Sequence, residues 1–224
     1  DGDYAMVMGF PGTTNHFLTS FGLEETMNVT NKLRYEIRTV KINILREEMA
    51  ASQATRIKYA SKYASCSNYW KYSNEQNKAL KNLNTMQLKK DIEAEYSQWA
   101  RSHDMKYQRA LGLIKDGYAS RKEAQVAMQY LSEGILQGPE LPWTMYRMGR
   151  QIKQVIEETK DAAERDAALD AIRAKAKEFY KDYNQATEMR LEAALFEYVS
   201  QNIAESYCPE FIKTANVKYR GNFN

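Results

Sequence analysis

The feature that most constrains this fold is a short apolar run at the N-terminus, followed by a long and almost wholly helical pattern. Residues Tyr4 to Phe10 form a brief apolar segment closed by Pro11 and Gly12, which is typical of a buried strand that ends in a turn. No later segment offers this strand a partner, and buried backbone N–H and C=O groups without partners are costly. We therefore expect a piece of a larger protein, whose first strand belongs to a β-domain absent from this chain.

The composition is that of a globular protein without a strongly charged or lipid-facing partner. The 224 residues carry 32 basic and 29 acidic side chains, a formal net charge of +3, and the two signs are mixed along the chain. This balance gives no argument for nucleic acid or an anionic membrane as a partner, and we expect no nucleic acid. No apolar run approaches the length of a membrane span, so no membrane insertion is expected, and no signal peptide stands at the start. Cys66 and Cys208 have no metal or redox spacing, and the sequence leaves open whether they pair.

The chain beyond the first turn predicts helices, because apolar residues recur at intervals of three and four, the spacing of one helix face. Ser52, Thr85 and Asp104 are the expected N-caps. The expected helices cover about residues 31–50, 53–82, 85–102, 104–117, 120–136, 145–155, 161–183 and 185–203. From Tyr207 onward the helical pattern decays. Short connections imply antiparallel neighbours, so we predict an all-α fold, an antiparallel multi-helix bundle with one N-terminal strand left over from an absent β-domain.

The chain lacks the residue patterns of a self-sufficient catalyst. Its two histidines, His16 and His103, follow a turn and end a helix, and neither is placed for a Ser-His-Asp triad. The His, Cys, Asp and Glu residues show no metal-ligand spacing, and there is no glycine loop for a phosphate. We therefore expect no metal, no cofactor and no catalytic residue in this chain.

One segment stands out by its content of Tyr, Ser and Asn, and it lies in the expected helix over residues 53–82. At about 100° per residue, four of its side chains share one arc of the helix: Tyr59, Tyr63, Cys66 and Trp70. Asn68 lies about opposite this arc, close to Ser61 and Ala64. Two interpretations are open. Either Asn68 only faces water, or it lies on a small-residue face that lines a cleft, where its side-chain carbonyl accepts a hydrogen bond from a cationic donor.

Two stretches of the chain resemble the bacterial dipeptidyl-peptidase 7 / dipeptidyl-peptidase 11 family. The run DYAMVMGFPGTT, from Asp3 to Thr14, is similar to a strand and turn of that family. The run RIKYASKYASCSNYWK, from Arg56 to Lys71, resembles the family's helical insert at a matching distance downstream. The similarity covers the whole chain and is strongest over residues 3–83. The two motifs together are more specific than either alone.

The resemblance implies a serine exopeptidase with a chymotrypsin-like double β-barrel, into which a large α-helical domain is inserted. Residues 1–20 would then be the end of the catalytic barrel, and residues 21–224 the inserted helical cap domain, truncated at its C-terminus. The triad histidine and aspartate would precede residue 1, and the nucleophilic serine would follow residue 224. The chain by itself is accordingly expected to be inactive.

The resemblance also implies a role for Asn68. In such enzymes an asparagine of the insert holds the free α-amino group of the substrate, so that cleavage follows the second residue. The matching position is Asn68, with Tyr69 and Trp70 as support that fixes the helix. The expected partners are oligopeptides with a free N-terminus, the missing barrel and a second copy in a homodimer, at the periplasm or surface of a bacterium. Residues that choose an acidic or hydrophobic second side chain would lie beyond this chain.

The alternative is a stand-alone helical interaction or scaffold module without catalysis. Such a module has no use for a strand over residues 4–10, whereas an insert in a barrel begins with one. A helical protein that lies on a membrane surface would need a basic face opposite an apolar one. Lys and Arg instead alternate with Asp and Glu on most of the expected helices. The sequence therefore favours the cap domain.

Overall fold

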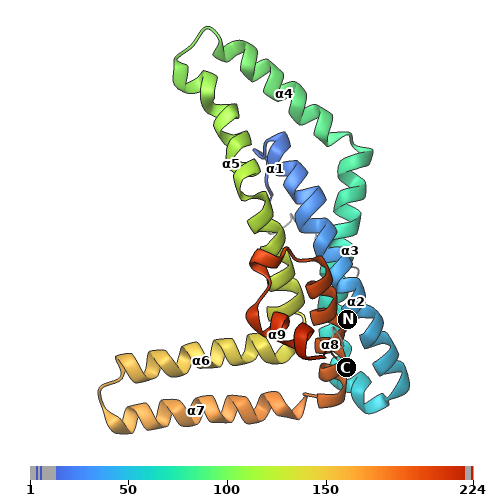
Figure 1. The fold of residues 1–224 in the computed structure, drawn as a ribbon, viewed down its shortest axis with the longest axis vertical. Coiled ribbons are helices and arrows are strands. Elements are labelled where there is room, and N and C mark those ends of the chain that lie inside the picture. Colours follow the sequence, from blue (N-terminus) through green and yellow to red (C-terminus); the bar gives the residue numbers. More distant parts are fainter. Residues whose placement is uncertain (1–3, 5, 7–13, 220–222, 224) are drawn as a thin grey trace.

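A computed structural model of the chain describes residues 4, 6, 14–219 and 223. All regular structure within these residues is helical, which confirms the all-α class. The expected strand over residues 4–10 lies outside the described part except for Tyr4 and Met6, neither of which belongs to a strand. The helices form a long trunk from which one hairpin projects sideways at the base (Figure 1).

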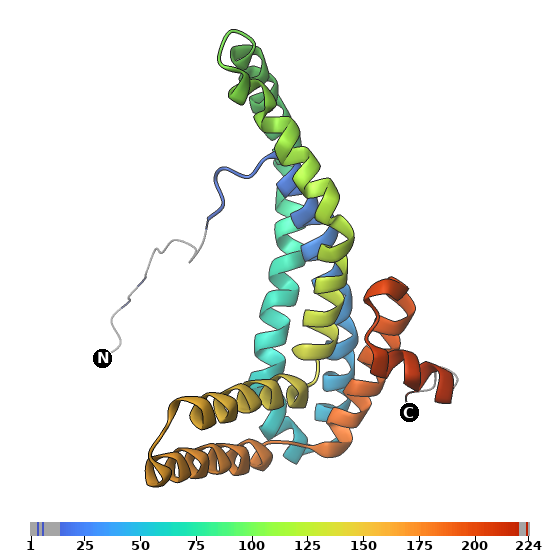
Figure 2. The same cartoon turned by 60° about the vertical axis from the view of Figure 1, so that its left-hand side comes forward.

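Two antiparallel helical rods form the spine of the trunk. The first rod comprises α1 (Ser20–Glu25), a π-helical turn (Thr26–Thr30) and α2 (Asn31–Ala51), and the second rod is α3 (Gln53–Asn82) (Figures 1 and 2). Ser52 joins the rods in an extended conformation, and its hydroxyl accepts the backbone N–H of Thr55 at 3.2 Å. This confirms the predicted N-cap and the predicted bounds 53–82. The first rod begins before the predicted residue 31, because a π-helical turn shifts the apolar repeat and hides the continuity.

The helices α4 (Thr85–Ala100) and α5 (Met105–Gln129) form a hairpin that extends the trunk at the end away from the projecting hairpin (Figure 2). Asn84, with a φ of 50°, turns the chain from α3 into α4, and Thr85 is the first helical residue rather than the predicted cap. The side chain of Asp104 accepts the backbone N–H of Lys106 at 3.0 Å, which confirms the predicted N-cap of α5.

The helix α5 passes through the point where the sequence predicted a break near residues 116–117. Gly112 and Gly117 both lie inside the helix, which continues into a π-helical segment, Tyr130–Leu136. The predicted boundary is therefore wrong. A glycine in a helix interior costs only about 1 kcal/mol relative to alanine, which does not stop a helix whose hydrogen-bond ladder continues on both sides.

The helices α6 (Glu140–Glu158) and α7 (Ala162–Lys181) form the projecting hairpin, here called the arm (Figures 1 and 2). The two helices pack on each other. Ile172 of α7 is the buried apolar residue of this hairpin. Apolar residues predicted to face a common core stay open to solvent: Ile152 on α6 is 37% exposed, and Leu88 on α4 is 56% exposed. The arm thus lies outside the bundle, since α6 and α7 pack mainly on each other, whereas α4 and α5 also pack on α1.

The helix α8 (Gln185–Asn202) packs against α2 and leads through a 3-10 turn (Glu205–Tyr207) into α9 (Glu210–Tyr219). The sequence did not predict α9, yet its Ile212 is fully buried. The most deeply buried apolar side chains are Ile37, Ile42, Leu45, Tyr59, Leu191, Leu195, Val199 and Ile212. The core therefore has two parts: α2 packs with α8, α9 and the π-helical segment Tyr130–Leu136 in one, and with α3 and α8 in the other.

Candidate functional site

Asn68 lies midway along α3 on its solvent-exposed side. Ser61 and Ala64, which share this side of the helix, are exposed as well. Within the described part of the chain, the Asn68 amide takes part in no hydrogen bond with another residue. Its carbonyl oxygen and its two N–H donors are therefore available to a ligand. The predicted placement of Asn68 on an exposed helix face with Ser61 and Ala64 is confirmed.

The opposite side of α3 faces the interior of the trunk, where it packs on α2, as the spacing predicts. Tyr59 and Cys66 are buried, and Tyr63 and Trp70 are half-buried. Burial raises the pKa of the Cys66 thiol above its ordinary value. Cys66 and Cys208 are both free thiols, so the question that the sequence left open is resolved against a pair.

Trp70 and Tyr69 both tie α3 to α2. The Trp70 indole stacks on Tyr35 with ring centroids 5.0 Å apart, and its Nε1–H donates to Thr39 Oγ1 at 2.8 Å. Tyr69 is 51% exposed, and the guanidinium carbon of Arg38 lies 5.2 Å from its ring centroid. These contacts hold α3 against α2 directly after Asn68, so its side chain extends from a well-packed helix.

A buried ionic cluster, which no sequence pattern predicts, also joins α2 to this stretch of α3. Glu133, whose side chain is 9% exposed, accepts from Arg34 Nε at 3.1 Å and from Arg38 Nε at 2.7 Å. Arg38 Nη1 also donates to the backbone carbonyl of Cys66 at 3.5 Å. Glu133 belongs to the π-helical segment, which lies almost 100 residues from α2 in sequence, so no local pattern reveals the cluster.

A depression of about 490 Å³ lies between α2, α3 and the start of α6; Asn68 itself does not line it, but its helical neighbours Ser65 and Tyr69 do. It is lined by Arg38, Lys41, Ser61, Lys62, Ser65, Cys66, Tyr69, Gln137, Pro139, Glu140, Trp143 and Thr144. Asn68 points within about 20° of Ser61 around the helix axis, two turns further along α3. We call this depression the α3 groove. Its walls combine basic, hydroxyl and aromatic groups, which suits a polar chain such as a peptide.

A second buried carboxylate fixes the base of the arm at one end of this groove. Glu188 on α8 is fully buried; its Oε1 accepts the Tyr59 hydroxyl at 2.8 Å, and its Oε2 accepts the first N–H of α6, from Glu140, at 2.9 Å. The Tyr59 hydroxyl in turn accepts the backbone N–H of Asn184, just after α7, at 3.2 Å. Burial raises the pKa of the Glu188 carboxyl and that of the Tyr59 hydroxyl. The Tyr59–Glu188 pair thus binds both points where the arm joins the trunk, the start of α6 and the residue Asn184 after α7.

The remaining sequence candidates lie at the surface. His103, at the end of α4, is exposed and stacks on Trp99 with centroids 4.0 Å apart, and His16 is exposed ahead of α1. The part of the chain that the structure describes contains no group of three or more His, Cys, Asp or Glu side chains arranged to hold a metal ion. Nor does any helix in that part have the length and apolar character needed to cross a bilayer.

Residues 1–224 match the family Peptidase S46. The chain is 35% identical over 223 residues to dipeptidyl-peptidase 7 of Porphyromonas endodontalis, covering 99% of this chain and 26% of that protein. It is 33% identical to dipeptidyl-peptidase 7 of Porphyromonas gingivalis, over 98% of this chain and 30% of that protein. An Asp/Glu-specific dipeptidyl-peptidase of Flavobacterium psychrophilum is 29% identical, over 97% of this chain and 30% of its own length.

The fold is also shared with a solved structure. The crystal structure of Porphyromonas endodontalis DPP11 in complex with the dipeptide Arg-Glu matches with a TM-score of 0.76 at 28% identity, over 96% of this chain and 31% of that chain. The chain thus spans about a quarter to a third of the length of these relatives. Because the family match covers every residue and the helical fold is reproduced, the chain belongs to the Peptidase S46 family.

Proposed function

We propose that this chain is the helical cap and substrate-recognition domain of a serine dipeptidyl-peptidase that releases dipeptides from the free N-terminus of oligopeptides. The family membership, the dipeptidyl-peptidase names of the relatives and the dipeptide bound in the DPP11 crystal structure support the proposal. Residues 1–20 would end the catalytic barrel, and residues 21–224 would form the cap. The hydrolytic groups would then lie elsewhere in the intact enzyme, and the 224-residue chain alone would release no dipeptides.

The proposed contribution of this domain is to bind the substrate's α-ammonium group through the side-chain carbonyl of Asn68. The observation that carries this assignment is the exposed Asn68 amide on α3, whose neighbours Ser65 and Tyr69 line the α3 groove. An ammonium group that leaves water needs hydrogen-bond acceptors in exchange, or its desolvation opposes binding. A site built around such acceptors rejects a blocked N-terminus strongly. Tyr69 and Trp70 would act by positioning Asn68 rather than by contacting the peptide.

Holding the amino group at a fixed point also sets where the chain is cut. An extended peptide advances about 3.3 Å per residue, so an anchored first residue places one particular peptide bond at a fixed distance. A nucleophile on the barrel at that distance would cleave after the second residue. In this arrangement the cap excludes peptides whose N-terminus is buried or blocked, and thus controls access to the barrel. We further propose a homodimer at the periplasm or cell surface, with neither nucleic acid nor membrane insertion involved.

The test uses the intact enzyme that contains this domain, with Asn68→Ala and a matched control. We expect Asn68→Ala to lower kcat/KM about 10- to 100-fold on a fluorogenic dipeptide with a free amine, because a hydrogen bond to a charged group contributes about 1.5–3 kcal/mol. Asn82→Ala removes an exposed asparagine near the end of the same helix, about 20 Å away, and should leave kcat/KM unchanged. The N-acetylated twin of the substrate should be cleaved poorly by all three proteins.

Equal kcat/KM values for Asn68→Ala and Asn82→Ala would assign amine recognition to the barrel and leave this domain a structural cap. A wild-type enzyme that cleaves the acetylated substrate as well as the free one would refute the aminopeptidase assignment itself.

A further inference from the structure

The arm carries a second exposed surface that the amine-binding role does not use. It consists of Trp143, Tyr146, Arg147 and Arg150 on α6, here called the α6 surface. The rings of Trp143 and Tyr146 stack with centroids 5.6 Å apart and planes inclined by 27°, although Tyr146 is 49% exposed. These residues border a depression of about 650 Å³ along the outer side of α6. Exposed stacked aromatic rings of this kind offer a flat apolar contact to a ligand.

Among the described residues, the two arginines of the α6 surface have no acidic group within ion-pair distance, in contrast to several arginines of the trunk. Arg34 and Arg38 share Glu133, and Arg190 binds two carboxylates. Within the residues that the structure describes, neither Arg147 nor Arg150 forms an ion pair or a side-chain hydrogen bond. They lie three residues apart on α6, so their side chains are neighbours on one face.

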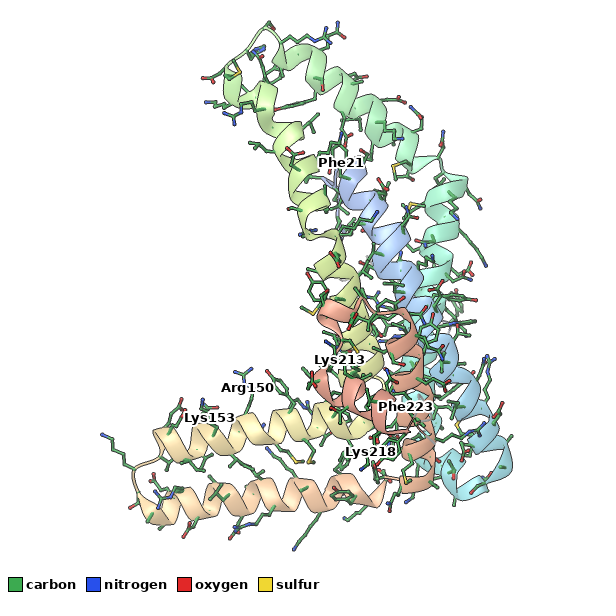
Figure 3. All side chains as sticks on the ribbon, in the orientation of Figure 1. Phe21, Arg150, Lys153, Lys213, Lys218 and Phe223 are labelled. Carbon is green, nitrogen blue, oxygen red and sulfur yellow. The ribbon has the colours of Figure 1, made fainter. Side chains whose placement is uncertain are left out.

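The direction of this basic face is visible in Figure 3, where Arg150 and Lys153 point away from α7. Lys153 is 3.6 Å from Glu157, so its charge is partly compensated. Glu157 and Glu158 close the outer end of the depression, at the tip of the arm. The two arginines without an ion pair therefore lie near the middle of α6, between the acidic tip of the arm and its base.

The α6 surface is continuous with the α3 groove. Trp143 lines both the α3 groove and the depression along α6. A peptide whose N-terminus lies at Asn68 can therefore follow the groove past Trp143 without leaving the protein surface. The start of α6 is also fixed in direction, because Glu188 accepts the N–H of Glu140 at the first residue of the helix.

We propose that the α6 surface binds acidic residues in the downstream part of an oligopeptide substrate, beyond the bond that is cleaved. The inference rests on the proposed function, because the substrate's N-terminus is placed at Asn68. Each guanidinium offers paired N–H donors that match the two oxygens of an Asp or Glu carboxylate. The stacked rings of Trp143 and Tyr146 provide the apolar contact for the intervening peptide. The surface thus selects among long peptides, while dipeptide-sized substrates do not reach it.

The experiment compares peptides of equal length in the intact enzyme. All share the same two first residues, followed by a Gly-Ala spacer of varied length and then either Asp-Asp or Asn-Asn. We expect the wild type to process the best-spaced Asp-Asp peptide with about three- to tenfold higher kcat/KM than its Asn-Asn twin, since two exposed ion pairs contribute modestly. The advantage should shrink as the salt concentration rises. The double variant Arg147→Ala/Arg150→Ala should abolish it and leave the fluorogenic dipeptide unaffected.

A charge-matched control removes two arginines from the other helix of the arm, Arg165→Ala/Arg173→Ala. This control should keep the preference for the Asp-Asp peptide. The proposal is overturned if the wild type shows no such preference at any spacer length, or if the Arg147→Ala/Arg150→Ala variant retains it. The outcome is separable from that of the amine assignment, because Asn68→Ala should slow all free-amine substrates equally, whatever their downstream charge. If Asn68→Ala left kcat/KM unchanged while the preference for Asp-Asp still depended on Arg147 and Arg150, only the assignment of the amine site to Asn68 would be refuted.

Discussion

Glu188 is the residue on which the geometry of the arm depends most directly. Its carboxylate is fully buried, and both of its oxygens accept hydrogen bonds from elements that meet at the base of the arm. No cation lies within ion-pair distance of it in the described part of the chain. The hydrogen bonds from Tyr59 and from the Glu140 N–H therefore stabilise the buried charge in place of a salt bridge.

We predict that Glu188→Ala lowers the free energy of unfolding by about 2–4 kcal/mol, because it leaves two buried donors without an acceptor. Glu188→Gln should cost less, since the amide oxygen can still accept the Glu140 N–H and the Tyr59 hydroxyl can reorient. Urea unfolding followed by circular dichroism measures both values. Equal losses for the two variants would show that volume rather than hydrogen bonding matters at this position.

The pH dependence of the same residue has a definite sign. Because burial raises the pKa of Glu188 above its ordinary value of 4.5, the folded chain binds this proton more tightly than the unfolded chain. Its contribution to the unfolding free energy is therefore greatest below the ordinary pKa and falls as the pH rises through the raised value. Relative to the non-titrating Glu188→Gln variant, the wild type should lose stability over that pH range. If the wild type instead gained stability relative to Glu188→Gln as the pH rises, the fold would favour the ionised carboxylate, and the pKa would be lowered rather than raised.

At the scale of elements, the glycines show where backbone packing is tight and where it is not. A Cβ built on Gly138, between the π-helical segment and α6, would lie 2.4 Å from the Gly134 carbonyl oxygen and 2.7 Å from Leu195 Cδ1. Backbone cannot move aside cheaply, so this connection needs the smallest residue. A Cβ on Gly117, inside α5, meets nothing within 4 Å.

We predict opposite effects for alanine at these two positions. Gly138→Ala should lower the free energy of unfolding by about 1–3 kcal/mol through steric overlap. Gly117→Ala should raise it by up to about 1 kcal/mol, because alanine favours the helix interior. Thermal unfolding of the two variants beside the wild type measures the signs. A destabilising Gly117→Ala would contradict an uninterrupted α5 and favour the break that the sequence pattern predicted.

At the scale of the whole molecule, the direction of the arm depends on the contacts at its base, where it joins the trunk. The helices α6 and α7 pack mainly on each other, and both ends of the arm are bonded to the Tyr59–Glu188 pair. Lys62 adds a bond to Glu140 at 2.6 Å across the same junction. The angle between arm and trunk therefore rests on a few buried polar contacts rather than on a broad apolar interface.

We predict that Glu188→Ala broadens the distribution of arm orientations. Spin labels at Glu164→Cys on the arm and Lys90→Cys on α4, in a chain with Cys66 and Cys208 replaced, would report the distance distribution by electron-electron double resonance. Glu178→Ala, an exposed change on α7, serves as the control and should leave the distribution narrow. Identical widths in both variants would show that the apolar packing alone fixes the arm.

Much of the local structure could be predicted from the sequence by itself. The N-caps Ser52 and Asp104 and the bounds of α3 follow from short-range hydrogen bonding and from the 3.6-residue repeat. The exposed placement of Asn68 follows from the same repeat, because a helix of known register assigns each side chain to a face. The family resemblance rests on the same local runs of residues.

Only the tertiary structure decided which of these faces meet and which stay open. Tyr59 and Glu188 lie 129 residues apart, and Arg38 and Glu133 lie 95 apart, so no local repeat relates them. The continuity of α5 and the burial of Ile212 likewise depend on what surrounds them rather than on their own pattern. The physical reason is that helix periodicity shows only which side of a segment is apolar. Which segment packs against that side depends on how all the segments fit together in the folded chain.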